Sequence, residues 1–306
     1  MADTPHSARN FVGYGQHPPD PQWPNGARIA VQFVLNYEEG GEMSVLDGDP
    51  HAETFLSEIV NATPFPDRHM SMESMYEYGS RSGVWRVLRA FARYEVPLTI
   101  FAVATALARN PEATSAFVDA GHEIAAHGLR WLSYQDVDVD TERAHMAEAV
   151  RLLTSLTGSA PLGWYTGRDS PRTRQLVMEH GGFLYDSDSY ADDLPFWASG
   201  RGQPHLVIPY ALDTNDMRFA TAAGFNSGTQ FYDYLKDAFD VLHAEGTTAP
   251  KMLSVGLHCR LAGRPGRTAA LERFLDYVTS HDDVWLTRRV DIARHWQAVH
   301  PASASR

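Results

Sequence analysis

Three short polar stretches of this chain carry side chains that could catalyse proton transfer. Glu38 and Glu39 follow one apolar run, His127 follows a second, and His258 ends a third. A carboxylate that is partly removed from water can accept a proton from a water molecule, because burial raises its pKa. An imidazole can take up or give a proton near neutral pH. The set therefore indicates general acid/base hydrolysis, provided that the fold brings the three stretches together.

The apolar runs around these residues have the length and composition of buried strands. We expect strands at 27–35, 97–102, 122–126, 163–166, 182–185, 206–210, 252–257 and 284–287. Between them, residues 83–94 and 141–156 place apolar side chains at helical spacing. Alternation of strands and helices over most of the chain predicts an α/β fold, with a parallel sheet closed as a β/α barrel. The polar stretches then lie at the carboxyl ends of strands, where barrel enzymes place their active sites.

We expect residues 1–306 to form one barrel domain with three irregular additions. Residues 1–26 are rich in Pro, Gly, Asn and His, which predicts an irregular arm on the surface. Residues 40–80 and 186–226 interrupt the alternation of strands and helices. Long insertions of this kind are usually functional, so we expect both to cap the mouth of the barrel.

The charge of the chain excludes some partners. With 38 acidic and 26 basic side chains the formal net charge is −12, so nucleic acid is not an expected partner. The sequence shows neither a signal peptide nor an apolar run long enough to span a membrane, and it has a single cysteine. These features predict a cytoplasmic protein with a small-molecule substrate and no membrane partner.

That single cysteine, Cys259, directly follows His258 and raises the alternative of a Cys/His nucleophile pair. Neighbouring residues of a strand point to opposite faces, however, so the two side chains are not expected to meet. A small buried thiol is the interpretation we favour.

Several motifs resemble those of the polysaccharide deacetylase family, the NodB-type deacetylases. Asn36–Gly40 is similar to the family's Thr-Phe-Asp-Asp-Gly, His127–Trp131 to its metal motif His-Ser/Thr-x-x-His, and Leu257-His258 to its closing Leu-x-His region. Residues 163–167 match the family's Arg-x-Pro-Tyr/Phe-Gly motif only faintly. In the family an Asp and two His hold a divalent metal, and the matching positions here are Glu39, His127 and Trp131.

An indole offers a cation no lone pair, so Trp131 cannot be a ligand. Catalytic zinc usually keeps three protein ligands, and only two candidates remain here. The resemblance therefore predicts no metal and no other cofactor.

The Glu-His-Trp pattern is similar to the allantoinase branch of that family, which is metal-independent. The likeness extends over nearly the whole chain and includes "FVLNYEEGGE", "GWYTGR" and "LDTNDMR". It implies a deformed β/α barrel of the polysaccharide deacetylase type, extra segments over the barrel mouth and assembly into a homotetramer. The activity it implies is a hydrolase reaction on a cyclic amide C–N bond, opening the hydantoin ring of (S)-allantoin to allantoate in purine degradation.

The expected catalytic groups are assigned as follows. Glu39 is the first choice for the base that activates water, with Glu38 in reserve. His258 protonates the leaving nitrogen or acts as the base itself, and His127 orients the base or the water. For substrate binding we expect Trp131, Tyr165, Arg168 and Asn215.

Two other functions stay open at this point. The chain could be an enzyme of another kind, either a metal-dependent N-deacetylase with a third metal ligand supplied from elsewhere or a hydrolase of another hydantoin or cyclic imide. It could also be a non-catalytic module that binds ureides. A chelator test separates the first from metal-free hydrolysis, and binding without turnover would identify the second.

Overall fold

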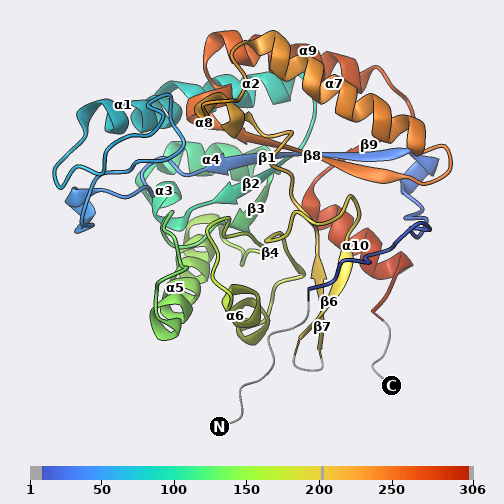
Figure 1. The fold of residues 1–306 in the computed structure, drawn as a ribbon, viewed down its shortest axis with the longest axis horizontal. Coiled ribbons are helices and arrows are strands. Elements are labelled where there is room, and N and C mark those ends of the chain that lie inside the picture. Colours follow the sequence, from blue (N-terminus) through green and yellow to red (C-terminus); the bar gives the residue numbers. More distant parts are fainter. Residues whose placement is uncertain (1–8, 201–202, 303–306) are drawn as a thin grey trace.

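The strands form one curved sheet that closes most of a barrel (Figure 1). The computed structural model describes residues 9–200 and 203–302. Along the order β6-β7-β5-β4-β3-β2-β1-β8 every pairing is parallel except the antiparallel β6–β7, and β9 pairs with the first half of β1. The strands are β1 Ile29–Tyr37, β2 Leu98–Ala102, β3 Glu123–Ala126, β4 Gly163–Trp164, β5 Tyr185–Asp186, β6 Phe196–Gly200, β7 Gln203–Val207, β8 Lys251–His258 and β9 Val284–Thr287.

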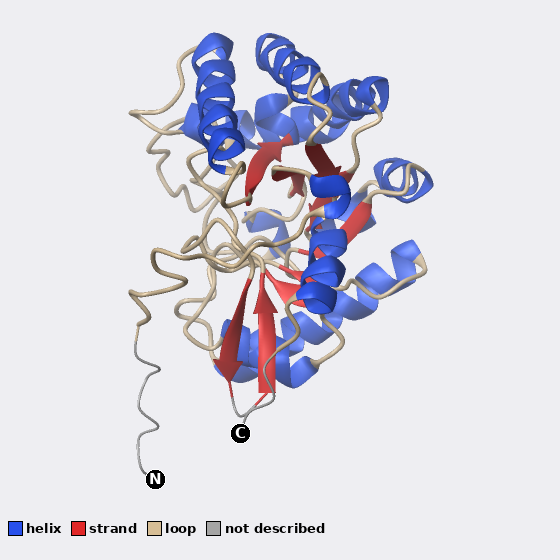
Figure 2. Cartoon of the chain, turned by 90° about the vertical axis from the view of Figure 1, so that its right-hand side faces the viewer, coloured by secondary structure: helices blue, strands red, loops and turns tan. Residues whose placement is uncertain are grey.

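Helices cover the outside of this sheet, and the long loops gather on one side of it (Figure 2). The helices are α1 Met70–Tyr78, α2 Val84–Tyr94, α3 Ala104–Arg109, α4 Pro111–Asp119, α5 Val139–Thr157, α6 Thr173–His180, α7 Gly228–Glu245, α8 Cys259–Ala262, α9 Pro265–Thr279 and α10 Arg289–Val299. The prediction of a deformed β/α barrel is confirmed.

Strand β1 sets the position of the chemistry. Each of its nine residues is buried, as expected for a strand covered on both faces. Its register pairs Asn36 with His258 of β8 and Tyr37 with Ala102 of β2. The carboxyl ends of these parallel strands therefore coincide at one edge, and the polar residues that follow them are brought together.

Most predicted strands and both predicted helices are present, but the region after α6 differs. The strand expected at 182–185 is β5, which begins only at Tyr185, because Gly181 and Gly182 adopt positive φ angles and turn the chain after α6. The strand expected at 206–210 is β7, which begins earlier and pairs with β6 in a hairpin. That hairpin lies inside the segment 186–226, which the sequence indicated only as an irregular insertion.

The predicted arm shows little regular structure where it is described, whereas both insertions contain regular elements. Within 9–26 the only regular element is a short turn at Pro24–Gly26, whereas 40–80 contains α1 and the start of a π-turn at Gly79–Gly83. Residues 1–8 of the arm and 201–202 of the second insertion lie outside the described residues.

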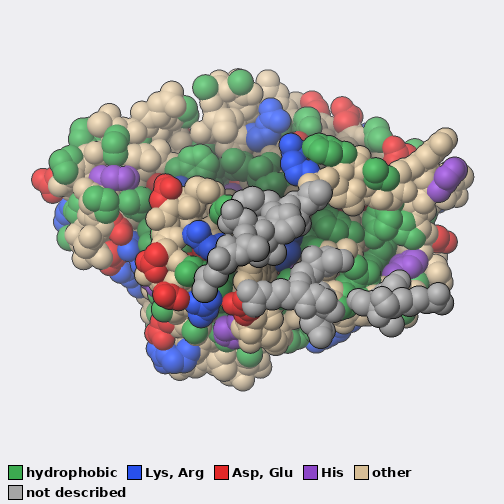
Figure 3. Space-filling view, turned by 60° about the horizontal axis from the view of Figure 1, so that its bottom comes forward, with side chains coloured by type: hydrophobic (Ala, Val, Ile, Leu, Met, Phe, Trp, Pro, Cys, Tyr) green, Lys and Arg blue, Asp and Glu red, His purple; other side chains and the backbone are tan. Residues whose placement is uncertain are grey.

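Two surface properties follow from the described part of the chain. None of its helices combines the length and apolar character needed to cross a bilayer. On the face shown in Figure 3, the visible Lys and Arg side chains are interspersed with Asp and Glu and form no continuous basic patch.

A buried arginine links strands β1 and β8, at one end of the sheet, to the segments that follow β5 and β7 near its other end. Arg289, the first residue of α10, is fully buried. It donates to Gln32 of β1 and Ser254 of β8 on one side, and to Ser187 and the Pro209 carbonyl on the other. These side-chain hydrogen bonds replace the backbone ladder that would close a complete barrel.

We expect Arg289→Met to lower the free energy of unfolding by about 3 kcal/mol, because it leaves several buried acceptors without a donor. Urea unfolding followed by circular dichroism measures the change. Arg294→Met, on the exposed side of α10, is the matched control and should shift the midpoint very little. Equal midpoints for the two variants would contradict a closing role for Arg289.

Candidate active site

The centre of the site is one carboxylate placed between two imidazoles. Glu38 follows β1, and its Oε1 lies 3.2 Å from His127 Nε2 and 3.4 Å from His258 Nε2. The exposed fractions of Glu38, His127 and His258 are 1%, 2% and 3%. Three titratable groups from three separate strand ends therefore meet in a place largely shielded from water, where electrostatic interactions are strong.

His258 is fixed by a buried aspartate. Its Nδ1 lies 2.6 Å from Asp216 Oδ1, and its backbone N–H donates to Asp216 Oδ2 at 2.8 Å. The same Oδ2 accepts a hydrogen bond from Ala262 N, so the carboxylate is anchored on both sides. Because Nδ1 faces a carboxylate it carries a hydrogen, and Nε2 is directed at Glu38.

His127 is held by a backbone carbonyl. Its Nδ1 lies 3.0 Å from the carbonyl oxygen of Tyr165, which can only accept, so Nδ1 carries a hydrogen. The ring stacks on that of Tyr165 with centroids 5.0 Å apart. Its Nε2 thereby faces Oε1 of Glu38.

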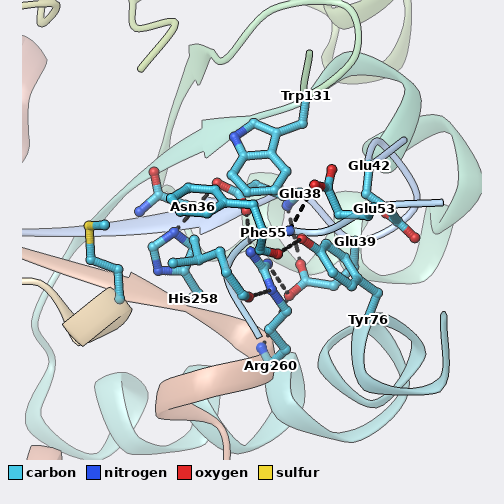
Figure 4. Close-up of polar contacts among 12 residues, drawn as sticks. Asn36, Glu38, Glu39, Glu42, Glu53, Phe55, Tyr76, Trp131, His258 and Arg260 are labelled. Carbon is cyan, nitrogen blue, oxygen red and sulfur yellow. Dashed lines mark hydrogen bonds and ion pairs between the residues drawn. The ribbon is translucent and has the colours of Figure 1, made fainter. Parts of the chain in front are cut away.

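Glu39 points away from the two imidazoles and toward Arg260. Its Oε1 accepts from the backbone N of Arg260 at 3.1 Å and lies 3.3 Å from the guanidinium, and its Oε2 accepts from the backbone N of Glu38. Arg260 also donates to Glu38 Oε2 at 2.6 Å (Figure 4). The two neighbouring glutamates thus share one arginine, while only Glu38 reaches the histidines.

These contacts set the protonation states. Burial alone would raise the pKa of Glu38, but the charges of Arg260 and His258 outweigh it and hold that pKa well below its usual value. Burial would lower the pKa of His258, but Glu38 and Asp216 outweigh it and raise it to about 9. Burial raises the pKa of Glu39, against the opposing charge of Arg260. At neutral pH the centre therefore holds an ionised Glu38 beside a protonated His258.

Aromatic rings and a second arginine form a wall next to this centre. The guanidinium of Arg168 lies 3.9 Å from the centroid of the Trp131 ring and donates to the Trp131 carbonyl. Phe55, from the 40–80 segment, stacks on Trp131 with centroids 5.8 Å apart. Trp131 is buried, whereas Phe55 is exposed and Arg168 is half-buried, so the accessible part of the wall is an aromatic ring beside a cation, which suits a planar polar ring.

The remaining predicted binding residues lie deeper. Asn215 is buried, donates to the hydroxyl of Tyr210 and accepts from Met217 N, so its amide is already used inside the protein. Tyr165 is also buried, and its hydroxyl contacts that of Tyr190. The structure brings His127, Trp131 and Arg168 to the site. The Asn215 amide and the Tyr165 hydroxyl instead contact other protein groups behind it.

The residues present do not fit a divalent metal. Glu39, His127 and Trp131 match the positions that hold the ion in the family that the sequence resembles, but Glu39 faces a guanidinium and Trp131 is packed against Phe55 and Arg168. Across residues 9–200 and 203–302, no group of three or more His, Cys, Asp or Glu is arranged to hold a metal ion. No step of the chemistry below passes through one.

Three residues of this site, Asp216, Arg260 and Phe55, were missed from the sequence. Asp216 lies in the run Asp213–Asp216, which is rich in acidic residues and gives no sign of which one turns inward. Arg260 directly follows His258 and Cys259, but arginine is mostly exposed in proteins, so the sequence favours a surface position. Cys259 is buried, and burial raises the pKa of its thiol well above the usual value, which argues against a nucleophilic thiolate.

Comparison with known proteins places this site in a family. A sequence profile described as "Polysaccharide deacetylase" matches residues 66–181. A Schizosaccharomyces pombe protein assigned to the polysaccharide deacetylases is 44% identical over 320 residues, which cover 98% of this chain and 100% of the relative.

Two solved structures are closer still. One, from Pseudomonas aeruginosa PAO1 and assigned as a polysaccharide deacetylase, has 65% identity and a TM-score of 0.95 over 96% of this chain and 99% of its own. The other, PuuE allantoinase, has 63% identity and a TM-score of 0.95 over 99% of this chain and 100% of its own.

The chain therefore belongs to the polysaccharide deacetylase family. Within that family it lies with the branch that contains the PuuE allantoinase structure, as the sequence motifs indicated. It is a hydrolase of C–N bonds outside peptides.

Proposed function

We propose that this protein hydrolyses the hydantoin ring of allantoin to allantoate by general acid/base catalysis without a metal. The observation that carries the proposal is the ionised Glu38 held between two imidazoles, one of them protonated and fixed by Asp216. Similarity to PuuE allantoinase over nearly the whole chain supports the choice of substrate.

Glu38 is the base in this mechanism. A water molecule gives its proton to Oε1 of Glu38 while its oxygen attacks the ring carbonyl carbon. Oε2 is held by Arg260, whereas Oε1 lies between the two imidazoles and is the oxygen that accepts the proton. Glu39, which the sequence favoured as base, faces away from the imidazoles and takes a supporting role beside Arg260.

His258 is the acid. When the C–N bond breaks, Nε2 gives its proton to the departing nitrogen, and Asp216 stabilises the charged imidazole before the transfer. His127 Nε2 lies 3.2 Å from Oε1 of Glu38 and can accept a hydrogen bond from Oε1 once Glu38 has taken the proton from water.

Substrate recognition is assigned to the aromatic wall. The hydantoin ring is flat and polar, and the Trp131 and Phe55 rings provide a flat apolar surface beside the catalytic centre. Arg168 supplies donors for a carbonyl oxygen of the substrate. With no metal to polarise the carbonyl, fixed donors must stabilise the developing oxyanion, each contributing a few kcal/mol.

Turnover of racemic allantoin by protein dialysed against a strong chelator tests the proposal. We expect full activity after metal removal, with one enantiomer left in excess. Activity that is lost on dialysis and restored by zinc would favour a metal-dependent amide hydrolase instead. Saturable binding of ureides with no hydrolysis of any of them would identify a binding module.

A further inference from the structure

Arg260 is a fully buried cation at the centre of the site. Its guanidinium contacts both Glu38 and Glu39, and its Nε donates to the Leu56 carbonyl at 2.9 Å. The guanidinium carbon lies 4.2 Å from the centroid of the Tyr76 ring. The guanidinium therefore has contacts on every side, and these contacts fix the position of its charge.

The fold is built around this arrangement. A Cβ atom at Gly79, in the π-turn 79–83, would lie 2.4 Å from Glu39 Oε1 and 2.8 Å from the backbone N of Arg260. Only glycine leaves room for the pair at that point. The turn that joins α1 to α2 therefore has the shape needed to hold the arginine against the glutamates.

A fixed cation at this point favours the ionised form of both glutamates. Glu38 and Glu39 are adjacent and buried, and two buried carboxylates repel each other unless a positive charge lies between them. The charge of His258 is paired with that of Asp216, and of the two glutamates His258 contacts only Glu38. Arg260 is the cation that reaches both glutamates, and a guanidinium cannot lose its charge in a protein.

The same guanidinium is a barrier to a metal. It uses Oε2 of Glu38 and Oε1 of Glu39, which are oxygens that a divalent ion would need. Its carbon also lies 5.4 Å from the Trp131 ring, which stands where the family has its second metal-binding histidine. A divalent ion in this position would meet a permanent positive charge at close range.

We propose that Arg260 is the site's built-in cation: it occupies the place of the family's metal ion and positions Glu38 so that Oε1 faces the two imidazoles. This inference rests on the proposed acid/base function for its kinetic consequence. Its structural part, exclusion of a divalent ion by the guanidinium, does not depend on the substrate.

Kinetics of Arg260 variants test the positioning role. Arg260→Gln should lower kcat for allantoin about a hundredfold with a smaller change in KM, because the base is misplaced while the aromatic wall is intact. Arg260→Lys keeps the charge but loses the two-pronged geometry, so it should recover about a tenth of wild-type kcat. Arg267→Gln is the control, since Arg267 forms an ion pair with Glu58 and contacts neither Glu38 nor Glu39.

Two kinetic results would overturn the positioning role. One is a kcat for Arg260→Gln within threefold of wild type, and the other is no recovery by Arg260→Lys. If circular dichroism shows that Arg260→Gln does not fold, the test rests on Arg260→Lys alone. Full wild-type kcat in Arg260→Lys would then refute the need for a guanidinium that contacts both Glu38 and Glu39.

Cobalt binding tests the structural part without any substrate. Trp131→His supplies the family's second metal-binding histidine, with Glu39 standing in for the family's aspartate, yet we expect it to bind Co²⁺ weakly while Arg260 is present. The double variant Trp131→His/Arg260→Gln should bind Co²⁺ at least tenfold more tightly by calorimetric titration. Equal affinity, or equal absence of binding, would refute the exclusion role. If the wild type hydrolyses no ureide, the proposed function fails, but this titration still stands as a test of Arg260.

Discussion

Glu38→Gln should lower kcat for allantoin about a thousandfold while KM changes by less than a factor of about three. The glutamine keeps the size of the side chain and can still meet Arg260 and the two histidines, but it cannot take a proton from water. Because the loss is confined to the chemical step, substrate binding at the aromatic wall should be little affected. Steady-state kinetics on metal-stripped protein give both constants.

The matched comparison is Glu39→Gln. Glu39 contacts Arg260 but not the imidazoles, so its replacement should cost about tenfold in kcat and act through the position of Arg260. A thousandfold loss in Glu39→Gln together with a nearly active Glu38→Gln would reverse the assignment. The base would then be the residue that the sequence favoured.

Much of the fold could be predicted from the sequence because the barrel strands are buried on both faces. Strand β1 reads as a continuous apolar run, and strands β8 and β9 are equally clear. The weak point was the region on either side of α6, where β4 before it and β5 after it are only two residues long and leave almost no pattern. Two-residue strands are held by their neighbours rather than by their own composition.

The site could be predicted only in part. The sequence supplied Glu38, His127 and His258, because each follows or ends an apolar strand and parallel strand ends meet at one edge. It could not decide between Glu38 and Glu39. Alternation shows that they diverge, but which one turns inward depends on Arg260, whose buried position no local pattern reveals.

The contact between Asp216 and His258 also could not be predicted from the local sequence. Asp216 reaches His258 from a short helical turn, Asp216–Ala220, inside the insertion 186–226. Such contacts between a loop and a distant strand depend on the whole tertiary structure. The aromatic wall is similar, since Phe55 belongs to the 40–80 segment and Trp131 to the loop after β3. The insertions thus supply residues to the site.

His258→Ala should lower kcat at least a hundredfold and also change the pH profile. In the wild type, Glu38 and Asp216 outweigh the effect of burial and raise the pKa of His258 to about 9. The acid form is therefore complete at neutral pH, and activity should fall as pH rises through about 9, where the imidazole loses the proton that the leaving nitrogen needs.

In His258→Ala the low remaining activity should not show this alkaline decline, because the titrating acid is absent. Profiles of kcat from pH 6 to 10.5 for the two proteins make the comparison, with unfolding checked at each end of the range. His122→Ala is the matched control, since His122 precedes β3 and its Nδ1 contacts the backbone N of Leu98, away from Glu38. An alkaline decline that persists unchanged in His258→Ala would show that another group supplies the proton, and His258 would then be a positioning residue for Glu38 rather than the acid.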